Sequence, residues 1–263
     1  MRIEFKSIVN SVVIQKRVIN ALILREIITR YGRHNIGFFW LFLEPILFTL
    51  GVTTLWTALK ASHGTTIPIV AFAITGYSSL IIWRNCSSRA VSAVEANHSL
   101  MYHRNVRVID IYTARILLEI IGTTSSLILL TLVFSAIGWM SFPVDILTAV
   151  FGWLLLAWFA FSLSLVIGAA SEFSELIDRM WHIFTYLLFP LSGAAFMVDW
   201  LPSSFKSVVL WLPMLHCTEM LRHGYFGSII KTYENPSYVI LINLLLTTLG
   251  LYLIKEVGKR IEP

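Results

Sequence analysis

Residues 146–171 read ILTAVFGWLLLAWFAFSLSLVIGAAS, which is 26 consecutive residues without a Lys, Arg, Asp or Glu. A helix needs about 20 predominantly apolar residues to cross the hydrocarbon core of a membrane. This stretch is long enough to cross, and its apolar character is continuous rather than alternating. It therefore predicts a transmembrane helix and places the chain among helical membrane proteins.

The composition of the whole chain agrees with this stretch. Of the 263 residues, 57% are apolar and only 13% are charged, with a mean hydropathy of +0.76. Soluble domains carry about 25% charged residues, so a soluble enzyme and a disordered chain are both excluded. An outer-membrane β-barrel is also excluded, because its strands alternate apolar and polar residues. The predicted fold class is an all-α polytopic membrane protein.

Six windows of the sequence predict six membrane spans. Inside these windows, every charged residue except Glu44 lies within four positions of a window end. Residues 1–35 precede the spans and residues 255–263 form a tail after them. The predicted spans cover residues 36–59, 67–84, 116–139, 146–170, 180–198 and 236–254.

A seventh apolar stretch, residues 207–218, lies between the fifth and sixth spans. It has 12 residues, which is too short to cross a bilayer. We interpret it as a re-entrant segment that enters and leaves the membrane on one side. A helix lying on the membrane surface is the alternative.

The basic residues predict the orientation. With six spans, 16 of the 20 Lys and Arg residues fall on the side that holds both termini, and four fall on the other side. Cytoplasmic loops carry the excess of Lys and Arg, so both termini are predicted to be cytoplasmic. The basic residues are spread over several segments without a recognition motif, so we expect no nucleic-acid partner.

Residues 3–33 have the spacing of an amphipathic helix. Apolar residues recur three and four positions apart, and five basic residues occupy the opposite face. Such a helix lies at the membrane interface with its basic face near anionic lipid. A plain membrane anchor and a more specific docking role both remain open.

Two further segments face the cytoplasm in this topology. Between spans two and three, Leu100, Met101 and Tyr102 form a short apolar knob between charged residues, which is typical of a docking point for a partner. Asp110 is predicted to be the N-cap of the following helix. The second segment, residues 172–179, is acidic and on its own predicts a solvated turn.

Three motifs resemble the membrane permeases of ABC-2-type polysaccharide exporters, most closely the capsular-polysaccharide permeases of Gram-negative bacteria (KpsM-like). The likeness covers essentially the whole chain. Where this chain has Leu212-Pro213, most members of that family have Asn-Pro. The motifs are LREIITRYGR (24–33) with GFFWLFLEP (37–45), AVEANHSLMY (93–102) with ARILLE (114–119), and WLPMLH (211–216) followed by Glu219 and Arg222.

This resemblance implies a transport subunit in the bacterial inner membrane that exports lipid-linked capsular polysaccharide to the periplasm. Such permeases are homodimers that work with two ATPase subunits, a periplasmic co-polymerase and an outer-membrane export protein. ATP and Mg²⁺ would bind the ATPase. This chain itself has no phosphate-binding loop, and we expect no catalytic residue, metal or cofactor in it.

The resemblance also assigns candidate site residues. The cytoplasmic loops of the family couple transport to the ATPase, and the late motif lies in the periplasm. The candidate coupling residues are Glu95, Asn97, His98, Leu100, Met101, Tyr102, Arg104, Glu172 and Glu175, and the periplasmic motif is His216, Glu219 and Arg222.

A few residues inside the predicted spans are candidates for a channel or gate. Glu44 precedes Pro45 and is either a residue at the cytoplasmic mouth or a buried acceptor that fixes a kink. Glu119 lies one turn after Arg115, which favours a structural ion pair. Aromatic rings can stack on sugars, which adds Trp40, Tyr77 and Tyr186.

Other functions remain as alternatives. Export of O-antigen or teichoic acid is the nearest of them. A secondary transporter is disfavoured because the middle of each span lacks charge and the chain shows no repeat. A membrane-bound transferase is disfavoured because its best polar cluster, His98 and His103 near Glu95, fits no common metal motif.

Overall fold

The computed structural model describes residues 2–31, 36–58, 67–101 and 106–261, and every regular element in this part of the chain is helical. This confirms the all-α class. The helices are α1 (Arg2–Tyr31), α2 (Ile36–Ala58), α3 (Ile69–Ala90), α4 (Val108–Ala136), α5 (Ile146–Ser171), α6 (Glu175–Leu188), α7 (Ser203–Val209), α8 (Pro213–Phe226) and α9 (Pro236–Ile261), with short 3-10 helices η1 (Glu95–Leu100), η2 (Val198–Trp200) and η3 (Gly227–Ile229).

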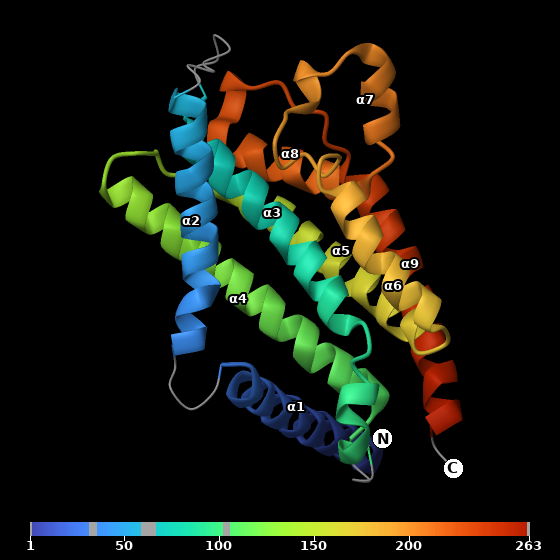
Figure 1. The fold of residues 1–263 in the computed structure, drawn as a ribbon. Helices are drawn as coiled ribbons and strands as arrows, with labels where there is room; N and C mark the ends of the chain where they lie inside the picture. The colour runs from blue at the N-terminus through green and yellow to red at the C-terminus, as the bar shows by residue number, and fades with distance from the viewer. Residues whose placement is uncertain (1, 32–35, 59–66, 102–105, 262–263) are drawn as a thin grey trace.

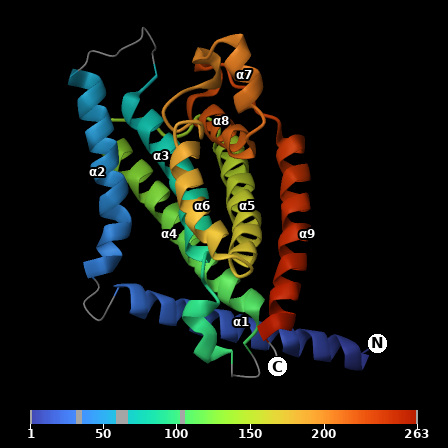
Figure 2. The ribbon, with the colours of Figure 1, turned by 45° about the vertical axis from the view of Figure 1, so that its right-hand side comes forward.

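The long helices form a bundle in which successive helices run in opposite directions (Figures 1 and 2). Helix α1 lies across one end of the bundle, where α9 also ends, and we call this the α1 end. The short helices α7 and α8 lie at the opposite end, which we call the α8 end. A helix placed across the end of a bundle is suited to a membrane interface rather than to a crossing.

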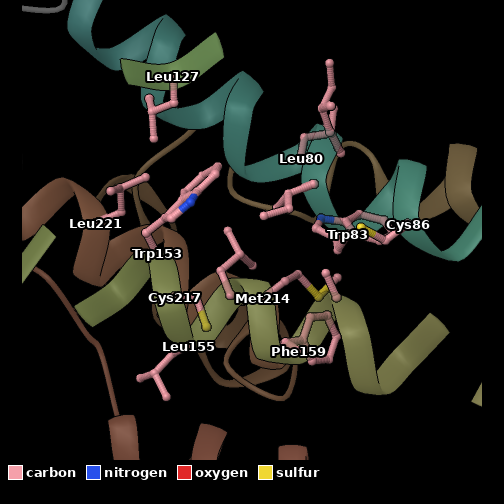
Figure 3. Packing of buried hydrophobic residues seen from close by; sticks show 14 of the residues in the cluster. Leu80, Trp83, Cys86, Leu127, Trp153, Leu155, Phe159, Met214, Cys217 and Leu221 are labelled. Carbon is pink, nitrogen blue, oxygen red and sulfur yellow. The ribbon is translucent and has the colours of Figure 1, made fainter. Parts of the chain in front are cut away.

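The core lies where α5 packs against α3 and α8. Figure 3 shows Trp83 of α3, Phe159 of α5 and Met214 of α8 among the side chains of one buried cluster. Glycines on α5 allow close approach: a Cβ at Gly152 would lie 2.8 Å from the backbone nitrogen of Leu221 on α8. Helix α5 is therefore the central helix of the fold.

Four helices are long and apolar enough to cross a membrane, judged by length and composition over the described residues. They are Ile69–Ala90, Val108–Ala136, Ile146–Ser171 and Pro236–Arg260. Within α2, which has 23 residues, the described apolar stretch is Ile46–Leu55. The polytopic class is therefore supported, and α5 matches its predicted bounds to within one residue.

The helix that contains the third predicted span begins earlier than expected. Helix α4 starts at Val108, three residues before the start implied by an N-cap at Asp110, and its N-cap is Arg107. Asp110 sits three residues into the helix, and its carboxylate accepts a hydrogen bond from the backbone N–H of Arg107 at 2.9 Å. This reciprocal capping explains why an acidic residue near the helix start was mistaken for the cap itself.

The fifth predicted span, residues 180–198, is not a continuous helix. Helix α6 ends at Leu188 and has 14 residues. Pro190 has no N–H to donate, the hydroxyl of Ser192 bonds the carbonyl of Phe189 at 2.7 Å, and Gly193 adopts a φ of +78°. Hydropathy alone does not register this turn, so the predicted helix was too long.

The predicted re-entrant segment, residues 207–218, is divided between two helices. Helix α7 ends at Val209 and α8 begins at Pro213, with a turn between them. Proline at the first helical position suits the start of α8, where its missing N–H has no partner to lose. At the other end of the chain, α9 continues as a helix into the predicted tail, as far as Ile261.

Candidate functional site

The two loops predicted to contact an ATPase meet at the α1 end. Glu172 accepts hydrogen bonds from the backbone N–H of Val94 at 3.2 Å and from the hydroxyl of Tyr112 at 3.5 Å. Burial raises the pKa of the Glu172 carboxyl, and the Val94 N–H partly offsets this by stabilising the charged form. Glu172 thereby joins the end of α5 to the residues that lead into η1.

Side chains of α1 form hydrogen bonds and an ion pair with this same region. The guanidinium of Arg25 donates to the side-chain oxygen of Asn97 at 2.7 Å, and Glu26 lies 3.5 Å from Arg115 of α4. Nearer its start, α1 is joined to α4 by a hydrogen bond from Gln15 to Asp110. These contacts attach α1 to α4 and to the loop that precedes it.

Both apolar and polar side chains of α1 face away from the bundle. Val12, Leu24 and Ile28 are each more than 60% exposed, and the basic residues Lys16 and Arg17 are exposed on the same helix. A helix that presents basic and apolar side chains together is suited to contact with the headgroup region at a membrane surface.

Three of the predicted coupling residues are exposed. Glu95 and His98 lie on the surface of η1, and Glu175 lies at the start of α6, where it is 3.6 Å from Arg179 one turn on. These residues are accessible to a protein that docks on the α1 end. An exposed pair such as Glu175 with Arg179 adds little stability.

Other predicted coupling residues point inward. Asn97 is buried, and its amide also donates to the carbonyl of Ala93 at 2.8 Å. Met101 is partly buried and packs against the core rather than standing out as a knob. The side chains of Leu100, Tyr102 and Arg104 lie outside the described residues.

The aromatic gate candidates differ in their surroundings. Tyr77 is buried in α3 and its ring stacks on Phe48 of α2 with centroids 3.7 Å apart. Tyr186 of α6 is 67% exposed, and the guanidinium of Arg84 lies 5.0 Å from its ring centroid. Of the two, Tyr186 is the one accessible to a ligand. The side chains of Trp40 and Glu44 lie outside the described residues.

Glu119 is buried and takes part in an ion pair between helices. Its Oε1 atom lies 3.6 Å from Nε of Arg89 at the end of α3. Arg115, the neighbour expected from sequence, also donates to the backbone carbonyl of Arg89 at 3.1 Å. Both residues therefore bind α4 to the end of α3, in keeping with a structural role.

Arg222 of the periplasmic motif is fully buried at the α8 end. Its guanidinium donates to the carbonyls of Gly193 and Phe196, each at 2.7 Å, and of Ala194 at 2.9 Å. These three carbonyls belong to the turn after α6. Because the helix does not continue there, no helical backbone N–H donates to them. The guanidinium also lies 4.0 Å from the ring centroid of Phe72. Arg222 thus replaces the missing helical hydrogen bonds of this turn.

Glu219 and His216 bond two other irregular segments. The two oxygens of the Glu219 carboxylate accept from the backbone N–H groups of Val198 and Tyr233, at 3.2 and 3.3 Å. The ring nitrogens of His216 lie 3.1 Å from the carbonyl oxygen of Tyr233 and 2.9 Å from that of Leu210. The motif therefore uses α8 to hold the loops around it in place.

Sequence reasoning missed the partners of these residues. Gly76 of α3 passes so close to the Arg222 turn that a Cβ there would lie 2.1 Å from the carbonyl oxygen of Ala194. The acceptors of Arg222 are backbone atoms 26 to 29 positions away in sequence, which leave no side-chain signature. The available sequence signal for this close contact was Gly76, an isolated glycine inside an apolar helix.

Comparison with known proteins places this arrangement in a family. The sequence model of the ABC-2 type transporter family matches residues 17–226, which include Arg25 and Glu26 of α1, η1 and the α8 motif. The chain is 49% identical over 253 residues to the capsule polysaccharide export inner-membrane protein CtrC of Neisseria meningitidis serogroup B, covering 96% of each chain.

Two further relatives have different sequence identities to this chain. The capsule polysaccharide export inner-membrane protein BexB of Haemophilus influenzae is 46% identical over 253 residues, with 96% of each chain covered. The polysialic acid transport protein KpsM of Escherichia coli is 28% identical over 240 residues, which is 91% of this chain and 93% of KpsM. The chain therefore belongs to the ABC-2 type transporter family.

Proposed function

We propose that this chain is the permease subunit of an exporter that moves capsular polysaccharide out of the cytoplasm across the inner membrane. The observation that carries the proposal is the match, over 96% of both chains, to relatives named as capsule polysaccharide export inner-membrane proteins. The bundle of apolar helices suits a permanent resident of that membrane.

The energy for transport comes, in this proposal, from two separate ATPase subunits that bind ATP and Mg²⁺. The sequence supports this because it contains no phosphate-binding loop of its own. The surface offered to the ATPase consists of η1 and the start of α6, with Glu95, His98 and Glu175 exposed. Its attachment to α1, through Arg25, and to α5, through Glu172, gives a docked ATPase a route to the bundle.

We further propose that two copies of the chain assemble and that the polymer, linked to a lipid, passes along their interface. Each copy crosses the membrane six times, with α6 completing the fifth crossing together with the residues that follow it. The hairpin of α7 and α8 enters from the periplasmic side, and both termini are cytoplasmic. A periplasmic co-polymerase and an outer-membrane export protein receive the polymer.

The function is tested by deleting the gene in its own host and restoring it from a plasmid. Loss of surface capsule, with polymer accumulating inside the cell, is the expected result. The restored strain should export normally, and affinity purification of the tagged permease should also recover an ATPase subunit. Normal capsule in the deletion strain, or loss of O-antigen with capsule intact, would contradict the proposal.

The orientation is tested by cysteine labelling. Cys86 and Cys217 are both buried, so the chain should label weakly before any substitution. Phe142→Cys, in the exposed turn at the α8 end, should react with an impermeant reagent added outside the inner membrane. Glu175→Cys should react only after the membrane is opened. The reverse pattern would overturn the orientation but leave the transport function in place.

A further inference from the structure

A polar groove lies between the end of α3 and the second half of α6, apart from the coupling loops and the α8 motif. It has a volume of about 270 Å³. Four of its residues come from the last two turns of α3 and three from α6. The lining residues are Arg84, Asn85, Ser88, Arg89, His182, Thr185 and Tyr186.

The groove is cationic. Two arginines line it, and no carboxylate is among its seven lining residues. Arg84 is partly buried, and in the described part of the chain its guanidinium is seen over the ring of Tyr186, not in an ion pair. Carboxylates do lie just outside the groove, where Glu119 is 3.6 Å from Arg89 and Asp178 is 3.6 Å from His182. Among the cationic side chains that line the groove, Arg84 is thus the one whose charge an anionic ligand would most stabilise.

The depth of the groove matches a membrane surface. Arg84 precedes the end of α3 at Ala90 by six residues, which is about 9 Å along a helix. Helix α3 ends at the α1 end of the bundle, where α1 lies across the other helices. A ligand in the groove would therefore lie at the level of lipid headgroups rather than in the middle of the bilayer.

The neighbouring face of α6 is apolar and exposed. Ile183, Phe184 and Leu187 are 55%, 46% and 60% exposed, and they directly adjoin the groove residues of the same helix. A ligand that places an anion in the groove can therefore lay hydrocarbon chains along α6. A free anion would use the arginines but would leave this apolar face uncovered.

We propose that the groove binds the anionic, phosphate-bearing headgroup of a membrane lipid in the leaflet at the α1 end, with the acyl chains against α6. The guanidinium of Arg84 matches phosphate oxygens with two parallel N–H donors, and Tyr186 holds its plane in position. Asn85, Ser88 and Thr185 supply further polar groups for the headgroup. The site is a property of the single chain and does not depend on the exported polymer.

The test titrates purified full-length permease with phosphatidylglycerol and, separately, with phosphatidylcholine of the same acyl chains, and measures binding by native mass spectrometry. The wild type should bind phosphatidylglycerol more tightly. Arg84→Gln should weaken phosphatidylglycerol binding about tenfold, as expected for loss of a charge-assisted hydrogen bond. Arg84→Lys keeps the charge but lacks the planar donors, so its affinity for phosphatidylglycerol should lie between those of the wild type and Arg84→Gln.

Arg179→Gln is the matched control, because it removes the same charge from α6 at a residue outside the groove. Its affinity should stay within about twofold of the wild type. Asn85→Asp keeps Arg84 and places a carboxylate in the groove, so it should weaken binding even if Arg84→Gln cannot be purified. Inorganic phosphate added at matched ionic strength should not displace the lipid.

Three results would overturn the proposal. They are equal binding of the two lipids, unchanged phosphatidylglycerol binding in both Arg84→Gln and Asn85→Asp, and full displacement of the lipid by inorganic phosphate. The last would assign the groove to a free anion. Because the measurement involves no transport, none of these results bears on the proposed export function.

Discussion

At the α8 end one helix supplies the buried charged groups, whereas at the α1 end charged groups from α1, α3 and α4 pair with one another. Arg222 and Glu219 both bond backbone atoms of irregular loops. Glu26 with Arg115, and Glu119 with Arg89, instead join side chains of different helices. The first arrangement fixes one loop conformation, while the second can break and re-form as helices shift.

This difference fits the proposed roles of the two ends, a fixed loop region at the α8 end and an ATPase-docking surface at the α1 end. A loop held by a buried guanidinium has no other source of hydrogen bonds, so its conformation is fixed for the life of the fold. Ion pairs with a partly exposed member, such as Arg89 with Glu119, are weaker and screened by salt. The end proposed to meet an ATPase is thus the end whose contacts can rearrange.

The largest effect is expected from Arg222→Met. This change roughly keeps the volume but removes the donor from three carbonyls, that of Gly193 buried and those of Ala194 and Phe196 partly buried, and a buried acceptor left unsatisfied costs about 1–3 kcal/mol. The permease should be scarce in membranes, and its melting temperature in detergent should fall steeply. Arg222→Lys should be intermediate, because one ammonium cannot match the geometry of the guanidinium. A normal melting temperature for Arg222→Met would show that the turn does not depend on this residue.

A slightly smaller effect is expected from Gly76→Ala. The added Cβ would lie 2.1 Å from the carbonyl oxygen of Ala194, so the backbone of the turn must move. A loss of about 1–3 kcal/mol in stability should follow, measured as thermal unfolding in detergent. Gly51→Ala is the control, since its Cβ meets nothing within 4 Å. Gly51→Ala should leave stability unchanged or raise it by up to about 1 kcal/mol; equal effects from both substitutions would refute the close contact.

The α1 end should respond more weakly. A double-mutant cycle of Glu26→Gln and Arg115→Gln should give a coupling energy of about 1 kcal/mol or less. The coupling should shrink as salt is added, because neither side chain is fully buried. A coupling of several kcal/mol that is insensitive to salt would mean that the two ends do not differ as described.

The smallest effect is expected from Asp199→Asn at the rim of the α8 end. Asp199 accepts from the hydroxyl of Tyr233 at 3.0 Å and from Lys206 at 3.3 Å, and the Tyr233 hydrogen bond lowers the pKa of Asp199 below its ordinary 3.8. A lowered folded-state pKa stabilises the fold above pH 3.8, and this contribution is lost as the pH falls through the folded value.

Because Asp199 is largely exposed, its substitution should lower stability by less than about 1 kcal/mol. Thermal unfolding at pH 7 and at pH 3 measures this: the difference between Asp199→Asn and the wild type should be smaller at pH 3. A larger difference at the lower pH would reverse the assigned sign.

The parts of the fold that depend on apolar length were predictable from the sequence. The span at 146–170 was found because a long charge-free stretch has few other uses, and Asp145 caps it as short polar residues often do. The meeting of Glu172 with the loop before η1 was not predictable, since it rests on a backbone N–H that no sequence pattern marks.

The fifth predicted span is not one continuous helix for a related reason. Residues 189–198 are apolar enough for a helix, and it is the turn at Pro190 and Gly193, satisfied by Arg222, that stops it. A long-range contact of this kind overrides local composition. The motif around Arg222 could be named from sequence, but the loop that needs it could not.

The turn between α4 and α5 has a consequence for the exchange of its amide hydrogens with solvent. The backbone N–H groups of Val144 and Asp145 donate to the carbonyls of Tyr225 and Gly224 at the end of α8, at 3.4 and 2.9 Å. The amides of a surface turn ordinarily exchange fast, whereas these two amides can exchange only when the turn separates from the end of α8. Their deuterium uptake therefore reports how often the start of α5 detaches from α8.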